Sequence, residues 1–285
     1  MIRAIIVPLV AFAATLNLTP AASAQEAEPG DTPVRLLLLG QGPDGHDAGT
    51  HEYHAGVRIM AACLERVEGL EVTIANADEP WSEGPELLQK ADGVVMFLSE
   101  GARWLHADAD RLEAFAQLAA RRGGLTAVHW AMGTKEARYI EGYLKLLGGC
   151  HGGDDRKYTV VETDLALADP KHPIAQGLAD FHIRDEFYYR LKMVKGDRGV
   201  RPIVTASIEG EQETLAWAWE RPDGGRSFGF CGCHFHENWK RPEYRRLVCQ
   251  GILWSLKLPV PEGGLAVDID ESLLVLPEVE GGESR

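Results

Sequence analysis

The 285-residue sequence has few cysteines, no long basic run and, beyond its first residues, no long apolar run. Its five cysteines are odd in number, so at least one thiol has no partner within the chain and a disulfide scaffold is excluded. Forty-three acidic against 29 basic residues give a net charge of −14, which repels phosphate backbones and anionic lipid. We therefore expect no nucleic-acid partner.

The first 24 residues have the layout of a secretory signal peptide. Met1-Ile2-Arg3 supplies a positive charge, residues 4–18 are almost wholly apolar, and Ala22-Ser23-Ala24 is a small-residue cleavage site. The apolar stretch is shorter than the roughly 20 residues of a spanning helix, so cleavage is favoured over the alternative of an uncleaved anchor. We predict an exported protein, periplasmic or secreted, with no transmembrane segment after cleavage.

The rest of the chain predicts one α/β domain. A flexible leader (25–33) precedes the domain (34–258), and a Pro-, Gly- and acid-rich tail (259–285) follows it. Short apolar runs alternate with stretches of helical periodicity through the first half, which predicts a doubly wound, mostly parallel sheet with helices on both faces. The strands expected there are 34–39, 72–75, 93–98 and 125–128, and the helices are 52–66, 85–90 and 108–122. The strands expected later are 157–162, 203–207, 214–219 and 227–232, before a final helix at 242–256.

Histidines follow the ends of several predicted strands. His46 and His51 come after the first strand, His129 directly after the fourth, and His234 and His236 after the last. Because the carboxyl ends of parallel strands meet at one edge of a sheet, we expect these side chains to converge on a ligand. A purely structural role for the histidines predicts instead that they are scattered in space.

Two spacings make a divalent metal such as zinc a candidate ligand. In an extended segment His234 and His236 point the same way, and on a helix capped by Thr50, His51 and His54 share a face. The predicted metal ligands are His46, His129, His234 and His236. Neither an H-E-x-x-H nor a C-x-x-C pattern is present, so the sequence does not require a metal and no cofactor is certain.

The segment 184–189 places the carboxylate of Glu186 beside the rings of Phe187, Tyr188 and Tyr189. Carboxylates accept hydrogen bonds from hydroxyls, and flat rings cover C–H groups, so this combination is typical of sugar binding. The alternative is an acidic strand end with buried tyrosines.

The sequence resembles the ThuA-like (trehalose utilisation) family over roughly residues 34–262, through six motifs in order. They are Gly45-His46-Asp47 with Gly49-Thr50-His51-Glu52-Tyr53, residues 123–129, Leu147-Gly148-Gly149, His172-Pro173-Ile174 with Gly177-Leu178, residues 183–189, and residues 232–239 leading into 245–254. The resemblance implies a flavodoxin-like sheet of the class I glutamine-amidotransferase type. It also implies a role in breaking down trehalose and related disaccharides through keto-sugars. The amidotransferase superfamily has a nucleophilic cysteine at the strand-to-helix elbow, where this chain has His129-Trp130, so we expect no glutamine hydrolysis.

These observations predict an exported enzyme that acts on a sugar or keto-sugar by acid/base or metal-assisted chemistry. Its catalytic residues would be His129, His234 and Glu186, because imidazole transfers protons near neutral pH. Its substrate-binding residues would be His46, His51, Glu52, Tyr188, His236 and Trp239. The alternative is a non-catalytic protein that binds carbohydrate or metal. The sequence leaves the oligomeric state open, a homo-oligomer included.

Overall fold

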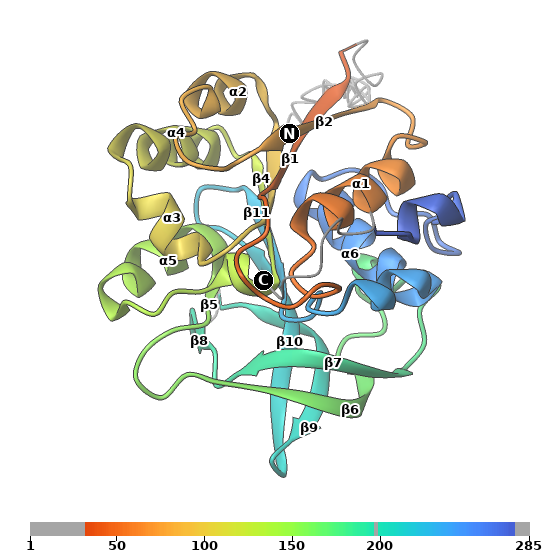
Figure 1. Cartoon of the computed structure of the whole chain (residues 1–285). Coiled ribbons are helices and arrows are strands. Elements are labelled where there is room, and N and C mark those ends of the chain that lie inside the picture. The colour runs from red at the N-terminus through yellow and green to blue at the C-terminus, as the bar shows by residue number, and fades with distance from the viewer. Residues whose placement is uncertain (1–31, 197–198, 277–285) are drawn as a thin grey trace, which may run out of the picture. The chain divides into compact units, whose positions relative to one another are not determined.

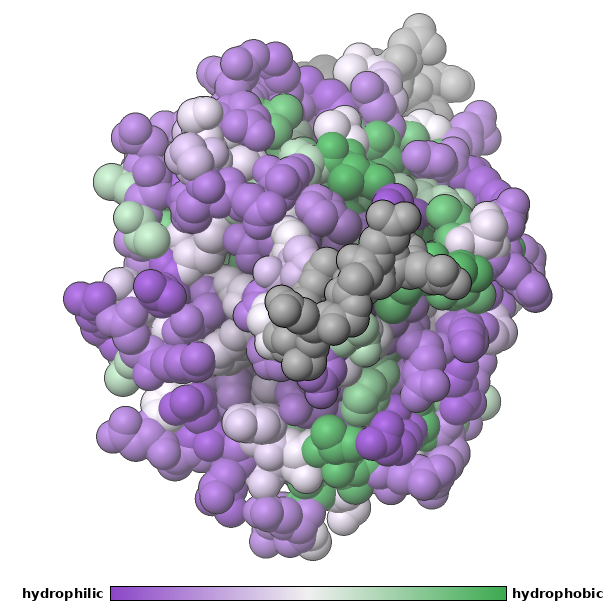
Figure 2. Space-filling view, in the orientation of Figure 1, coloured by the Kyte–Doolittle hydropathy of each residue, from purple (hydrophilic) through white to green (hydrophobic). Residues whose placement is uncertain are grey.

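The computed structural model describes residues 32–196 and 199–276. The predicted signal peptide and most of the predicted leader lie outside the described residues. Within the described part, no helix is both long enough and apolar enough to cross a bilayer. In the view of Figure 2 the described surface is mostly hydrophilic, as expected for a chain so rich in charge.

Five parallel strands form one half of a nine-stranded sheet. In spatial order they are β2 (Leu70–Asn76), β1 (Val34–Gly40), β3 (Gly93–Phe97), β4 (Gly124–Val128) and β11 (Arg226–Phe230). The three central strands β1, β3 and β4 are buried over most of their length, as their aliphatic runs predict. The predicted α/β doubly wound fold is confirmed.

Four antiparallel strands continue the sheet beyond β11. They are β10 (Glu211–Glu220), β9 (Arg201–Ile208), β6 (Lys157–Leu167) and β7 (Phe181–Tyr189). The strand β7 was not predicted, and β6 is longer than expected. A separate small pair joins β5 (Gly149–Cys150) to β8 (Lys192–Met193). In Figure 1 the β6–β7 hairpin lies below the parallel strands, and the loop that follows β1 descends toward it.

Helices cover both faces of the parallel strands (Figure 1). On one face lie α1 (Tyr53–Leu64) and α6 (Pro242–Ser255), and on the other lie α2 (Gly84–Lys90), α3 (Gly101–His106), α4 (Ala109–Ala120) and α5 (Ile140–Leu147). Short 3₁₀ helices are η1 (His129–Met132), η2 (Ala137–Tyr139), η3 (Pro173–Ala175), η4 (His236–Lys240) and η5 (Glu271–Leu274). All five cysteines are free and buried.

The predicted tail packs against α1 and α6 as far as the structure describes it. Leu265 and Val267 are buried, and the guanidinium of Arg245 donates to the Val267 carbonyl over 2.9 Å. The backbone N–H of Leu265 donates to the side chain of Gln250 over 2.7 Å. This described part of the tail therefore adds to the core.

Gly101 is the point where α3 touches the backbone after β4. A Cβ added to Gly101 would stand 2.0 Å from the carbonyl oxygen of Ala131, in η1. We predict that Gly101→Ala lowers the free energy of unfolding by about 1–3 kcal/mol, because backbone must move to admit the methyl group. Denaturant unfolding measures this loss. Gly263→Ala is the control, since a Cβ there meets nothing within 4 Å; equal stability of both variants would contradict the packing described.

Candidate metal centre

Three histidines converge from three different strand ends. His51 lies in the loop after β1, His129 follows β4 directly, and His234 comes four residues after β11 ends. The register pairs Val128 at the end of β4 with Phe230 at the end of β11. The segments that follow these two strands therefore leave the sheet side by side. The cluster therefore lies beyond the carboxyl ends of the parallel strands, where α/β sheets bind ligands.

The backbone is strained at two of these histidines and directly before the third. His51 and His129 have φ values of +52° and +50°, and Cys233, which precedes His234, has a φ of +84°. Residues other than glycine seldom adopt such angles, and they gather at functional sites because the surroundings must enforce them.

The side chains form a compact group of four ligating atoms. Nε2 of His129 lies 2.9 Å from Nε2 of His51 and 3.2 Å from Nδ1 of His234. From β7, Oε1 of Glu186 lies 3.6 Å from that His234 nitrogen and 3.9 Å from His129 Nε2. All four residues offer atoms within 4.8 Å of one another. The alternative in which His51, His129 and His234 are scattered in space is therefore ruled out.

Hydrogen bonds on the outer side fix where two of the imidazoles carry their protons. A carbonyl oxygen only accepts, so His129 Nδ1–H donates to the Cys231 carbonyl over 3.0 Å. The carboxylate of Asp44 likewise accepts from His51 Nδ1–H over 2.9 Å. In their neutral forms both imidazoles then direct a lone pair from Nε2 into the cluster.

Two lone pairs that face each other across 2.9 Å repel unless a cation lies between them. A zinc ion with bonds of about 2.0–2.1 Å in tetrahedral geometry has ligand atoms about 3.3 Å apart, by simple geometry. The four separations given above, 2.9–3.9 Å, bracket that spacing. Three imidazoles and one carboxylate therefore fit a divalent transition metal.

Burial keeps the histidines neutral. Burial, followed by the neighbouring imidazoles, holds the pKa of His129 well below its ordinary value and lowers the pKa of His234 to about 3. Burial also lowers the pKa of His51, although the hydrogen bond to Asp44 opposes it. Burial and then the charge of Asp185 raise the pKa of Glu186 to about 7. Neutral imidazoles are the form that binds metals.

A second carboxylate, that of Asp185, connects two of the segments that form the site. It is fully buried and accepts from the backbone N–H groups of Glu186 (2.9 Å), Cys233 (3.0 Å) and Phe235 (3.2 Å), and from the Tyr244 hydroxyl. It thereby ties the segment that bears His234 to the strand that bears Glu186. Burial raises its pKa to about 6 against these hydrogen bonds.

An outer layer of polar groups surrounds His51. Asp44 also accepts from the Tyr53 hydroxyl (2.7 Å) and bonds to His46 Nδ1 (2.6 Å). The ring of His46 stacks on that of His51, with centroids 3.7 Å apart, and its side chain is 47% exposed. His46 is therefore placed at the solvent side of the cluster.

A cavity of about 180 Å³ opens beside the cluster. Tyr188 forms part of its wall, and the Tyr188 hydroxyl lies 3.2 Å from His129 Nε2. Glu186 is the one carboxylate in its lining. The other lining residues are His46, His51, Trp130, Lys135, His151, Arg156 and Tyr158.

Several predicted site residues lie elsewhere. The prediction that His234 and His236 point the same way is wrong, because the chain turns into η4 at His236 and the alternation of an extended strand is lost. His236 Nε2 faces the Leu274 carbonyl at 3.2 Å. It belongs neither to the four-residue group nor to the second group of potential metal ligands in the described residues, which consists of Asp44, His46 and His51. Trp239 is a core residue packed on Phe97.

The start of α1 also differs from the prediction. The helix begins at Tyr53 with Glu52 as its N-cap residue, and Thr50 donates instead to the Asp47 carbonyl. His51 lies before the helix, so the face that it was predicted to share with His54 does not form. Glu52 accepts from Gly49 N–H over 2.9 Å and lines a neighbouring cavity of about 300 Å³.

Sequence reasoning missed Asp44 and Asp185, and named His51 and Glu186 without assigning them to a metal. Asp44 lies two residues before His46, a spacing that could have indicated a carboxylate–histidine pair. The sequence gives less indication of a role for Asp185. An acidic residue at an inward-facing position of a possible strand usually counts against the prediction of a strand.

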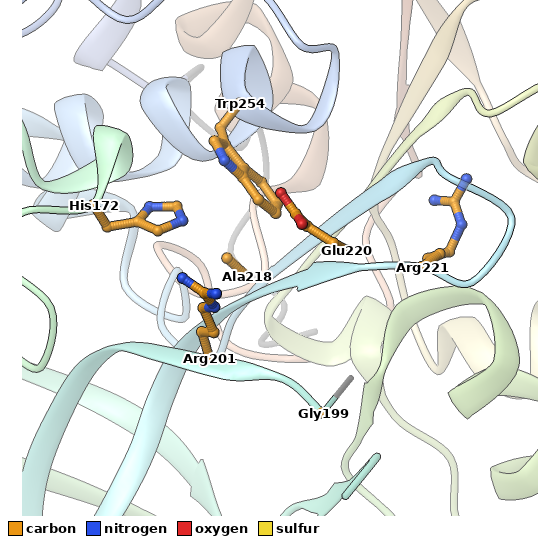
Figure 3. A pocket seen from close by; sticks show the side chains of 7 residues that line it. All are labelled: His172, Gly199, Arg201, Ala218, Glu220, Arg221 and Trp254. Carbon is orange, nitrogen blue, oxygen red and sulfur yellow. The ribbon is translucent and has the colours of Figure 1, made fainter. Parts of the chain in front are cut away.

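A separate hollow of about 260 Å³ lies at the opposite edge of the sheet, where β10 ends at Glu220. In Figure 3 the side chains of His172, Arg201, Glu220 and Trp254 face a common space, whereas Arg221 points away from it. Within the described residues it contains no group of three converging metal-ligating atoms.

Comparison with known proteins agrees with the fold. Residues 44–255 match the ThuA family model, described as trehalose utilisation. A putative ThuA-like protein from Parabacteroides merdae has 17% identity and a TM-score of 0.59, over 81% of this chain and 92% of that one. Another from Bacteroides uniformis has 14% identity and a TM-score of 0.62, over 81% and 94%. No curated protein matched the chain.

The Asp185 network predicts a specific loss of stability. Asp185→Asn turns an amide group toward at least one N–H donor, and we expect it to lower the free energy of unfolding by about 2–3 kcal/mol. Denaturant unfolding is the measurement. Asp164→Asn, on the adjacent strand, is the matched control: it loses an exposed bond to His182, worth less than about 1 kcal/mol. An Asp185 variant as stable as this control would contradict the anchoring role.

Proposed function

The chain belongs to the ThuA family of trehalose utilisation, and on that premise we propose that it is an exported enzyme of disaccharide catabolism that acts on a sugar or keto-sugar. Its centre would be a divalent metal such as zinc, held by His51, His129, His234 and Glu186. The observation that carries the proposal is the convergence of two imidazole lone pairs, fixed by Asp44 and the Cys231 carbonyl, on a point that a third imidazole and a carboxylate also reach.

The metal would supply Lewis acidity toward a carbonyl or hydroxyl oxygen. This assignment replaces the predicted ligands His46 and His236 by His51 and Glu186. It also changes the role proposed for His129, His234 and Glu186, whose ligating atoms are then engaged with the metal and not with protons of the substrate.

His46 is the group best placed to move a proton. Its Nδ1 is held by Asp44 at 2.6 Å, and its Nε2 has no hydrogen-bond partner in the described residues. An imidazole oriented by a carboxylate on one side and open on the other is a typical general base. Because His46 also lines the cavity, it would take a proton from a carbon next to a carbonyl or from a hydroxyl.

The cavity does not favour classical glycoside hydrolysis. That reaction needs two carboxyl groups on either side of the scissile bond. Glu186 is the single carboxylate among the described residues that line the cavity, and it faces two histidines. Chemistry at a carbonyl, such as isomerisation or elimination on a keto-sugar, fits the residues better. Glutamine hydrolysis is not proposed, since His129 and not a cysteine follows β4.

The test is turnover of oxidised (3-keto) and unoxidised disaccharides by the zinc-loaded chain. We expect activity that a chelator removes and added zinc restores. His46→Gln should lower kcat by about 10²–10⁴-fold while zinc remains bound, which is the usual contribution of a general base. His182→Gln is the matched control, because His182 lies on the same strand as Glu186 but is exposed and pairs with Asp164.

Two outcomes would contradict the proposal. Sugar binding without any turnover by the zinc-loaded chain would identify a non-catalytic binding protein. Full activity in the presence of chelator, with no zinc bound, would show that the reaction does not need a metal.

A further inference from the structure

We propose that the cavity beside the histidine cluster selects sugars that carry an anionic group, and that Lys135 and Arg156 bind that group. The inference rests on the proposed function, because it assigns a substrate class to the same site. Both cations line the cavity together with His51 and Glu186. A ligand that fills it therefore reaches the proposed metal centre and the two cations at once.

The two cations stand on segments that are tied to each other. Lys135 comes shortly after η1, and Arg156 shortly after His151. The backbone of Thr134 donates to the His151 carbonyl over 2.9 Å, and His151 donates to the Met132 carbonyl over 3.0 Å. These reciprocal bonds join the two segments from which the side chains of Lys135 and Arg156 extend.

Neither cation has a carboxylate partner in the described part of the chain, although acidic groups lie close by. Asp155, next to Arg156, is paired with Lys192 at 2.6 Å. Glu136, next to Lys135, is paired with Arg138 at 2.6 Å. Two cations at one cavity, with Glu186 as the carboxylate among the described lining residues, attract an anionic group of a ligand.

The remaining wall is suited to a sugar ring. Trp130 and Tyr158 contribute aromatic surface that can cover C–H groups, whereas the ring of Tyr188 is stacked on the imidazoles of His129 and His151. The His151 ring stacks on Tyr188 with centroids 4.2 Å apart, and its buried Nδ1 has no hydrogen-bond partner. An unpaired buried polar atom beside a cavity is commonly completed by a ligand or an ordered water.

The size of the cavity limits what enters. At about 180 Å³ it is smaller than the roughly 300–1,000 Å³ of pockets that enclose drug-sized ligands. It therefore takes one sugar ring, with the rest of a disaccharide outside. The anion on that ring is a carboxylate or a phosphate, both of which guanidinium and ammonium groups bind.

Calorimetric titration of the full zinc-loaded chain with D-glucose, D-glucuronate and D-glucose 6-phosphate tests the inference. We expect at least one of the two anionic sugars to bind about tenfold or more tightly than glucose, and which one does identifies the anion. The double substitution Lys135→Gln with Arg156→Gln should bring the three affinities together. Arg138→Gln, which removes a nearby cation that does not line the cavity, should keep the preference.

Three other outcomes would overturn the inference. Equal affinity of glucose and both anionic sugars for the wild-type chain would overturn the inference and leave the proposed function standing. Inorganic phosphate or acetate binding as tightly as the anionic sugars would show an adventitious ion only. If the chain took up zinc but none of the sugars, the proposed function would fail and this inference with it.

Discussion

Two imidazole nitrogens, Nε2 of His51 and Nε2 of His129, lie 2.9 Å apart, and neither carries a proton when both neutral rings donate through Nδ1. The constraint comes from outside the pair, because the Cys231 carbonyl and Asp44 each engage the opposite ring nitrogen. Left empty, such a contact is repulsive and costs stability. Filled by a divalent cation, it becomes part of a four-ligand set. The protein thus accepts an unfavourable arrangement in its own polar groups at a place where a cation would offset it.

The fold supplies this arrangement in two steps. Parallel strands bring His129 and the chain after β11 to the same edge, in a register that pairs Val128 with Phe230. The buried carboxylate of Asp185 then connects the segment after β11 to β7. This connection brings Glu186 and Tyr188, which lie on β7, next to the histidines. The positive φ values at His51 and His129 are maintained by this surrounding network. The antiparallel half of the sheet therefore completes a site that the parallel half begins.

Sequence patterns predicted the parallel half and the convergence of histidines there, since buried strands are continuous apolar runs and their carboxyl ends share an edge. They did not predict β7, because its inward position 185 is an aspartate and the segment lacks clean alternation. An extended segment past Cys233 would bring His236 to the site, but the chain turns there and enters η4 at His236. The ligand set depends on such turns and on contacts between residues far apart in the chain, which local periodicity does not contain.

The central claim is that His51, His129, His234 and Glu186 bind one divalent cation together. X-ray absorption at the zinc edge, on purified protein loaded with one equivalent of zinc, tests it most directly. The account predicts a shell of nitrogen and oxygen atoms at about 2.0–2.1 Å with the outer-shell scattering of three imidazoles. Sulfur at about 2.3 Å, which would place the ion on cysteines, or zinc bound by water alone, would contradict it.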